Sequence, residues 1–419
     1  MRSITRCYEG RRGSIRVPPV VFASVFEAEG KEEAMALTTA TQTSPYPDSP
    51  CLYMALELSA AKWGLALSAG GQRIREKSIR AGACEQLLEE ISAAKKRFGL
   101  PEDAKVISCY EAGRDGFWID RVLGRLGIEN VIIDAASMKV DRRARRAKTD
   151  KIDAKRLLAD LIRHVRGEKD VWKVVRVPSE EQEDKRRLHR ELERLKKEKT
   201  QHRVRILSLL ATQGVRPGNL KAFLVELDAA RIWDGKPLPP ALKAEIEREW
   251  SRLRLVEEEI RSITKEQREQ LKQPGSPELK MIKMLTRLRG IGVDSAWILV
   301  MEFFAWREFN NRREVGGAAG LGGTPYSSGS IEREQGISKA GNPRVRTRAV
   351  ELAWLWIRFQ PHSELSQWFM RRFAGGGSRM RRKGIVAVAR KLLIALWHLV
   401  EHGTVPRGAV IDLTESCPG

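Results

Sequence analysis

Four acidic residues stand in three short motifs that are far apart in the sequence. They are Glu57 in LELS, Glu111 in YEAGRDGFW, and Asp150 with Asp153 in KTDKIDAKRLL. Carboxylates that gather in one place repel one another unless cations lie between them. Two Mg²⁺ ions about 3.5 to 4 Å apart are what phosphodiester chemistry uses to hold attacking and leaving oxygens. If the fold brings the three motifs together, the four acids form a two-metal site.

Each motif taken alone has a simpler interpretation. An Asp-x-x-Asp pair in a basic helix is usually a solvated, salt-bridged face, although its two side chains do share one side of the helix. A glutamate before Ala-Gly can simply end a strand. The catalytic hypothesis therefore depends on the three motifs acting together.

A basic run precedes the aspartate pair. Its cations are Arg142, Arg143, Arg145, Arg146 and Lys148. The whole chain of 419 residues carries a formal net charge of +22. A surface of this charge binds a polyanion through phosphate neutralisation and counterion release. Nucleic acid is therefore the expected partner, ahead of an anionic membrane.

The elements that must position the acids form a mixed sheet over about residues 50–175. Three short antiparallel strands over 51–79 precede a helix at 83–98, a buried strand that ends at Glu111, a second helix, and a strand near 128–136. Three antiparallel strands followed by alternating helices and strands indicate a ribonuclease H type α/β domain covered by helices. In such a sheet the strand ends lie beside the face of the following helix.

A coiled-coil hairpin is predicted over residues 179–272, where apolar residues recur about every 3.5 positions in two charged helices. The first helix carries a narrow seam of three leucines, Leu188, Leu192 and Leu195. A single short hairpin would leave this seam open, so we expect self-association to a dimer or tetramer. His189 and His202 are interpreted as surface or seam residues.

A mostly helical domain is expected over residues 280–402, with tails at 1–49 and 403–419. Residues 330–400 contain fourteen Lys and Arg against four acids, which indicates a second basic surface. Four tryptophans are interpreted as core residues: Trp354, Trp356, Trp368 and Trp397.

The turn RGIG, with Arg289, Gly290 and Gly292, stands between two helical stretches. Backbone N–H groups at a helix start suit a phosphate, although a simple interhelical turn is an equal reading. Three residues of GISKAGNPRVRTRAV complete the candidate nucleic-acid contacts: Lys339, Asn342 and Arg344.

Cysteine usage and hydropathy exclude other classes. The five cysteines are scattered singly, without a Cys-x-x-Cys motif, so they support neither a disulfide framework nor a zinc site. No apolar run reaches the roughly 18 to 20 residues of a membrane span, and the first residues lack a signal peptide's apolar stretch. A protein of the reducing cytoplasm fits these features.

The three acidic motifs, in this order, resemble the DEDD transposases of the Piv/MooV type, relatives of the RuvC junction resolvases. LRGIGVDSAWILVMEF, LGGTPYSSGS and GISKAGNPRVRTRAV are similar to that family's C-terminal transposase domain in order and spacing, so the resemblance covers about residues 50–400. It implies a transposase or site-specific recombinase with an RuvC-like domain that binds Mg²⁺. Many insertion-sequence members are guided by a structured bridge RNA. The family usually has Asp at the position of Glu57, whose extra methylene lengthens the reach by about 1.5 Å.

The resemblance also assigns a nucleophile. By composition alone, Ser-Ser-Gly in PYSSGS is a flexible turn. By resemblance, Ser328 is the serine that attacks DNA and forms a covalent phosphoserine link, with Ser327 and Ser338 as alternatives. Two other functions stay open: an RuvC-like structure-selective nuclease that uses only the carboxylates, and a non-catalytic nucleic-acid-binding protein in which Glu57 marks a decayed site.

Overall fold

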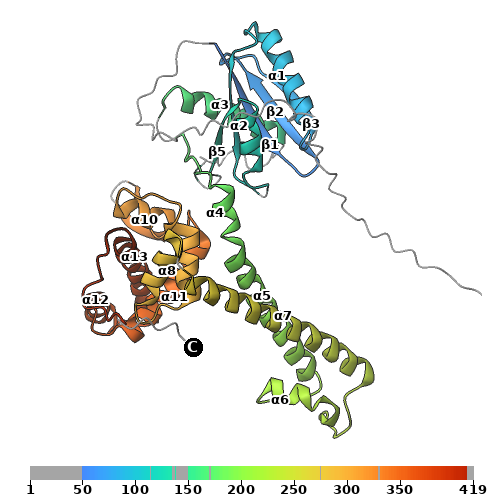
Figure 1. Cartoon of the computed structure of the whole chain (residues 1–419), viewed down its shortest axis with the longest axis vertical. Helices are drawn as coiled ribbons and strands as arrows, with labels where there is room; N and C mark the ends of the chain where they lie inside the picture. Colours follow the sequence, from blue (N-terminus) through green and yellow to red (C-terminus); the bar gives the residue numbers. More distant parts are fainter. Residues whose placement is uncertain are drawn as a thin grey trace, which may run out of the picture. The chain divides into compact units, whose positions relative to one another are not determined.

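The chain divides into two compact units between Val177 and Pro178, called here the N-terminal and the C-terminal unit (Figure 1). The computed structural model describes residues 50–113, 115–134, 137, 150–168, 171–273, 275–328 and 331–412. The basic run from Arg142 to Lys148 lies outside the described residues, as does the expected tail 1–49.

The N-terminal unit is built on one five-stranded mixed sheet. Its strands are β1 (Cys51–Leu58), β2 (Lys62–Ser68), β3 (Arg75–Arg80), β4 (Lys105–Glu111) and β5 (Glu129–Ile133). They lie in the order β3-β2-β1-β4-β5. The first three strands pair antiparallel, whereas β1 with β4 and β4 with β5 are parallel. The predicted mixed α/β class, with an antiparallel meander first, is confirmed.

Helices cover both faces of this sheet. Helices α1 (Cys84–Phe98) and α2 (Trp118–Arg125) pack on one face, in a core with Leu52, Met54 and Leu56. Helix α3 (Asp150–Val165) packs on the other face, in a core that includes Ala55. Successive side chains of a strand point to opposite faces. Position 57 therefore belongs to the face that α3 covers.

The C-terminal unit begins with a helical hairpin. Its elements are α4 (Glu180–Asp184), α5 (Arg187–Ala211), α6 (Leu220–Val225), a 3₁₀ turn (Leu227–Ala229) and α7 (Pro240–Lys272). Helices α5 and α7 lie side by side (Figure 1). Proline suits the first position of α7, because an N–H at this position would have no partner within the helix and proline lacks that N–H. Ile206 and Leu210 of α5 share a core with Ile246 and Leu253 of α7.

The leucine seam of α5 is largely covered within the same chain. Leu192 is only 3% exposed, and Leu188 and Leu195 are half-buried. This seam therefore presents no open apolar stripe. Self-association remains a prediction, and it would require a surface other than this seam.

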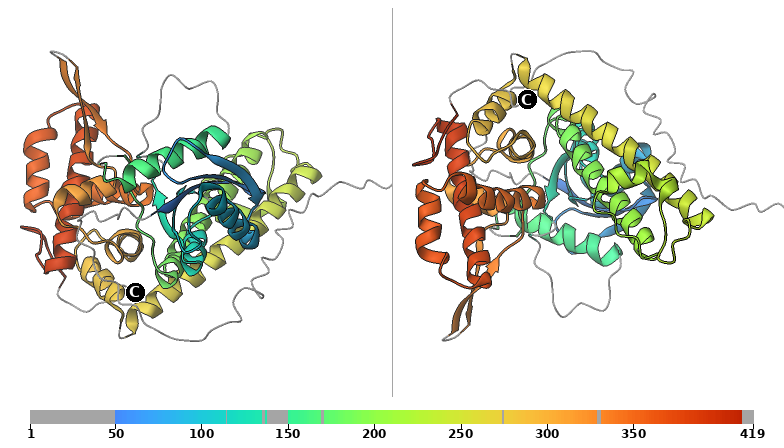
Figure 2. Two further views of the ribbon diagram at one scale, coloured as in Figure 1. Left: turned by 90° about the horizontal axis from the view of Figure 1, so that it is seen from above. Right: turned by 90° about the horizontal axis from the view of Figure 1, so that it is seen from below.

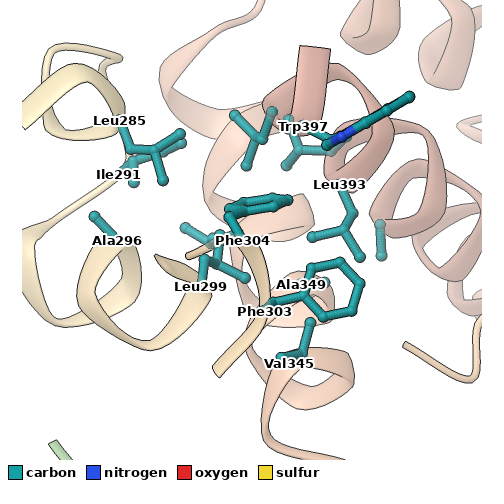
Figure 3. Packing of buried hydrophobic residues seen from close by; sticks show 14 of the residues in the cluster. Leu285, Ile291, Ala296, Leu299, Phe303, Phe304, Val345, Ala349, Leu393 and Trp397 are labelled. Carbon is teal, nitrogen blue, oxygen red and sulfur yellow. The ribbon is translucent and has the colours of Figure 1, made fainter. Parts of the chain in front are cut away.

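A core of helices completes the C-terminal unit. These are α8 (Pro277–Thr286), α9 (Val293–Leu299), a π-helical turn (Val300–Phe304), α10 (Arg312–Ala318), α11 (Pro343–Phe359), α12 (Glu364–Phe373) and α13 (Ser378–His402). Figure 3 shows Phe303 and Phe304 packed among aliphatic residues such as Leu299 and Leu393. Within the described ranges, no helix has the length and apolarity of a membrane span.

The tryptophan interpretation is correct for two of the four residues. Trp356 and Trp397 are 1% and 6% exposed and belong to the core. Trp368 is half-buried. Trp354 is 49% exposed, so its assignment to the core is wrong. Trp354 lies on the exposed side of α11. The presence of a tryptophan in the sequence does not show which side of its helix will be covered by other helices.

The segment read by composition as a flexible turn is part of a β-hairpin. Strand β6 (Gly323–Ser328) pairs antiparallel with β7 (Ile331–Ile337), and Ser328 is the partner of Ile331. Figure 2 shows this hairpin projecting from the helices of its unit. The sequence did contain the signal, because two residues including Gly between runs with Tyr, Thr and Ile favour a tight hairpin. Reading Ser327 and Ser328 as loop residues was wrong.

Candidate active site

Glu57 and Glu111 lie at the carboxyl ends of two neighbouring parallel strands. The register pairs Leu56 with Tyr110, so the two glutamates are the next residues on β1 and β4. Neighbouring strands are about 4.7 to 4.9 Å apart. Both glutamates line one cavity of about 400 Å³, which Ser59 also lines. The fold thus brings together two acids that are 54 positions apart in sequence.

The start of α3 lies beside the same strand end. Ala154 of α3 is 4% exposed and packs in the core between this helix and the sheet. It lines a second cavity of about 330 Å³ together with Glu57. Asp153 immediately precedes it and is half-buried. Asp150 is the first residue of the helix, and its side chain is not among those described. The backbone segments that carry all three acidic motifs therefore lie at this edge of the sheet.

The donor set at this edge consists of carboxylate oxygens, which are the ligands that Mg²⁺ prefers. Among the described side chains, no three from His, Cys, Asp and Glu come close enough to hold a metal ion. The metal-binding role of Glu57, Glu111, Asp150 and Asp153 thus remains a prediction, and the side chain of Asp150 lies outside the described part of the chain.

Sequence reasoning missed several residues around these cavities. Asp115 lines the cavity that Glu57 and Glu111 share. Glu76 lines the second cavity of Glu57 and forms an ion pair with Lys155 at 2.8 Å. Gly64 is the strand partner of Glu57, and a Cβ at this glycine would stand 3.6 Å from the Cβ of Glu57. A glycine inside a strand often marks a close approach of a ligand or backbone. That signal was available in the sequence.

A second acidic centre lies in the C-terminal unit, at Glu302 in the π-helical turn. Its carboxylate, 1% exposed, accepts hydrogen bonds from His189 Nε2 at 2.9 Å and from Arg190 Nε and Nη2 at 2.6 and 2.9 Å. Asn342 Nδ2 donates a further bond at 3.2 Å. Burial alone would raise the pKa of Glu302, but the bonds from His189 and Arg190 outweigh it and hold the pKa well below the usual range.

This network joins α5, the π-helical turn and the start of α11. Of the two predicted positions for His189, the surface is wrong, because the residue is 2% exposed and its Nε2 is bonded to Glu302. A π-helical turn inside an α-helix often marks a specialised position. Here it places a glutamate among cations, and the carboxylate's hydrogen-bonding capacity is used within the protein.

A third acidic centre is Glu249 of α7, which lies between the hairpin helices. Like Glu302, it is bonded to a histidine and to arginine. It is 5% exposed and accepts bonds at 2.7 Å from His202, Arg205 and Arg252. Burial tends to raise the pKa of Glu249, yet His202 and Arg205 together keep it below its ordinary value. His202 therefore is a seam residue, in agreement with one of its two predicted positions.

The predicted nucleic-acid contacts near α11 have structural roles. Asn342 caps α11, since its Oδ1 accepts from the N–H groups of Arg344 and Val345 at 3.0 and 3.3 Å. Arg344 pairs with Glu193 of α5 at 2.8 Å. Lys339 is exposed, and its positive φ of 56° is unusual for a residue other than glycine. The backbone of Lys339 is held as well, because its carbonyl accepts a bond from Arg346 Nη1 at 2.9 Å.

The RGIG turn is built into the unit's core. Arg289 pairs with Asp412 at 3.0 Å, and its carbonyl accepts a bond from Gln360 Nε2 at 3.1 Å. Gly290 has a φ of 91°, and a Cβ there would stand 3.2 Å from Phe359. These contacts support the interhelical-turn reading, while phosphate binding at Gly292 and its neighbours stays a prediction.

The candidate serines belong to the β6–β7 hairpin. Ser327 and Ser328 are the last residues of β6, and their side chains are not described. Ser338 follows β7, is exposed, and donates its backbone N–H to Gly322 at 2.8 Å. The backbone alone does not choose among the three.

Comparison with known proteins gives a consistent picture. Residues 282–366 match the family model described as "Transposase IS116/IS110/IS902 family". A protein of Sinorhizobium fredii (strain NBRC 101917 / NGR234) named "Putative transposase y4rJ" is 42% identical over 378 residues, 87% of this chain and 95% of the relative. A second protein of that strain, "Putative transposase y4qE", is 29% identical over 61% of this chain and 60% of its own length.

Proposed function

Because the chain belongs to the IS116/IS110/IS902 family of DNA transposases, we propose that it cleaves and rejoins DNA with two groups of residues. The first is the carboxylate edge of the N-terminal unit, which we take to be a ribonuclease H or RuvC-like domain. The second is Ser328 of the C-terminal unit. Strand order β3-β2-β1-β4-β5, with the antiparallel meander first, supports the proposed fold type.

The observation that carries the proposal is the placement of Glu57 and Glu111. They stand next to each other on parallel strands, line one cavity, and adjoin the start of α3, where Asp153 lies. Together with Asp150, they would hold two Mg²⁺ ions. Bound Mg²⁺ supplies positive charge for the attacking and leaving oxygens of a phosphodiester. The longer side chain of Glu57 is compatible with this role, because Gly64 leaves space beside it.

A serine needs help to act as a nucleophile. Its hydroxyl is weak at neutral pH without a base or a metal environment. Ser328 has no acid or histidine within three residues, and its nearest acid in sequence is Glu332. We therefore assign activation of the serine to the carboxylate site. On this proposal neither unit cleaves DNA alone, and cleavage depends on assembly with DNA.

DNA is the substrate, and the finer partners are part of the proposal. A structured guide RNA and a dimer or tetramer are proposed from the resemblance to bridge-RNA-guided members. A reaction on cellular DNA would take place in the cytoplasm. RNA that copurifies with the chain and maps beside its gene would support guidance.

The serine mechanism is tested by a covalent protein–DNA adduct that survives denaturant. The full chain, with Mg²⁺ and DNA that contains the sequences flanking its gene, is expected to form the adduct. Ser328→Ala should abolish the adduct and leave DNA binding unchanged, whereas Ser338→Ala, the matched hydroxyl deletion, should retain it.

The other outcomes separate the alternatives. An adduct that persists in Ser328→Ala moves the nucleophile to Ser327 or Ser338. Mg²⁺-dependent cleavage without any adduct identifies a nuclease that uses the carboxylates alone. Binding without cleavage identifies a protein with no catalytic role.

A further inference from the structure

A large hollow lies in the C-terminal unit among α10, α12 and α13, with a volume of about 1010 Å³. Its lining contains seven cationic side chains: Arg312, Arg313, Arg371, Arg372, Arg390, Lys391 and Arg407. Glu364 is the one acidic residue in the same lining. None of the seven forms an ion pair with another residue in the described part of the chain. Cations gathered without counterions repel one another, so this surface favours a polyanionic ligand.

Two of the cations are held in place by neighbouring side chains and backbone. Arg390 lies across α10, where a Cβ at Gly316 would stand 2.9 Å from its Nε. The Nζ of Lys391 lies 4.9 Å from the ring centroid of Trp368, a distance that suits a cation–π contact. The glycine thus makes room for one cation, and the indole supports the other.

The remaining wall of the hollow is apolar and aromatic. Trp368 and Phe373 meet edge to face with ring centroids 5.3 Å apart. Helices α12 and α13 approach closely at Gly384, where a Cβ would stand 2.5 Å from Phe373. Leu365 and Ile394 complete the apolar part of the lining. Cations and aromatic rings therefore share one concave surface.

We propose that this hollow binds a single strand of DNA, with its phosphates on the arginines and a base against the apolar wall. Sites for single strands combine a cationic groove with aromatic side chains, whereas a duplex keeps its bases stacked inside. The established substrate is DNA, and Ser363 carries the one hydroxyl of this lining. The hydroxyl of Ser363 already donates to Gln360 O at 2.9 Å and accepts from Trp356 Nε1 at 2.9 Å.

This site is separate from the proposed chemistry. It uses neither the carboxylates nor Ser328, so it stands or fails independently of them. A strand-exchange enzyme must hold strands that have left the duplex, and this hollow supplies a place for one.

The test measures binding of the full-length protein to a fluorescent oligonucleotide of about twelve deoxythymidines. Arg371→Gln with Arg372→Gln removes two exposed cations of the hollow. We expect affinity to fall on the order of tenfold, and the salt slope to fall by about 1.4, since each lost contact to a single strand is worth roughly 0.7. Arg248→Gln with Arg268→Gln, two exposed arginines of α7, removes the same charge and should change neither quantity.

Crosslinking and further binding measurements decide the assignment. A photoreactive thymidine analogue in the oligonucleotide should crosslink to α12 or α13, and Ser328→Ala should leave binding and crosslinks intact. An equal loss of affinity in the α7 control, or crosslinks confined to other elements, would overturn the proposal. Tighter binding of an oligouridine RNA of the same length would overturn the choice of DNA, and an equal loss of duplex binding would overturn the choice of a single strand.

Discussion

Glutamates in the two units have opposite surroundings. In the N-terminal unit, Glu57 and Glu111 stand at strand ends and line cavities of about 330 and 400 Å³. In the C-terminal unit, Glu302 and Glu249 are 1% and 5% exposed, and each is bonded to a histidine and to arginine. The same side chain faces an open cavity in one unit and is enclosed by cations in the other.

This contrast separates a carboxylate that can take a ligand from one that serves the fold. The lone pairs of Glu302 are engaged by three residues of its own chain, which leaves little for a metal ion or substrate. A buried pair of this type is costly to break, since removal of one partner leaves the other charge uncompensated. Glu111 is exposed and lines a cavity, so its oxygens are accessible to a cation. The comparison predicts that substitutions should affect activity in the first unit and stability in the second.

The largest effect is expected at the cavity. Glu111→Gln should lower Mg²⁺-dependent DNA cleavage by about 10³-fold, because the metal site supplies several kcal/mol of transition-state stabilisation. The thermal unfolding midpoint should stay unchanged, because Glu111 is exposed. Cleavage of labelled DNA and circular dichroism measure the two quantities. Glu102→Gln, an exposed acid of the same unit, is the control. Cleavage within tenfold of the unmodified protein would remove Glu111 from the site.

A large effect on stability is expected at Glu302. Glu302→Gln keeps the side chain's size but leaves the charge of Arg190 uncompensated. Because the buried carboxylate loses its charge-assisted hydrogen bonds, the free energy of unfolding of the C-terminal unit should fall by about 1.5 to 3 kcal/mol. Urea titration followed by tryptophan fluorescence measures it. Glu258→Gln, at an exposed position of α7, should stay within about 0.5 kcal/mol. If both variants unfold alike, the network does not stabilise the unit.

A smaller effect is expected from pH. The pKa of Glu302 is lowered in the folded state, so the unfolded state binds more protons once the pH falls below the ordinary value of 4.5. The stabilisation is therefore complete above that pH and is lost progressively below it. Urea midpoints measured across this range should fall more steeply for the unmodified protein than for Glu302→Gln. Parallel curves would show that other acids control the acid sensitivity.

The amino-acid sequence determined the order of elements in the N-terminal unit. A nearly continuous apolar run such as CLYMALEL identifies a strand buried on both faces, and such local patterns need no distant partner. The same patterns put Glu57 and Glu111 near the ends of strands. Only a few sheet arrangements are possible for such a series of strands, and in a ribonuclease H type sheet the two strands are neighbours. The sequence therefore sufficed to place these two acids together.

Only the tertiary structure decided the features that depend on distant contacts. Glu302 meets His189 and Arg190 across 113 and 112 positions, and in sequence it is one acid inside an apolar run. The cationic hollow combines α10, α12 and α13, whose basic residues are ordinary helix surface until the helices pack. Periodicity reports which side of a helix is buried, but not which helix covers it. Packing of the apolar core around Phe303 and Trp356 determines which helices are neighbours. The positions of the charged side chains follow from this packing.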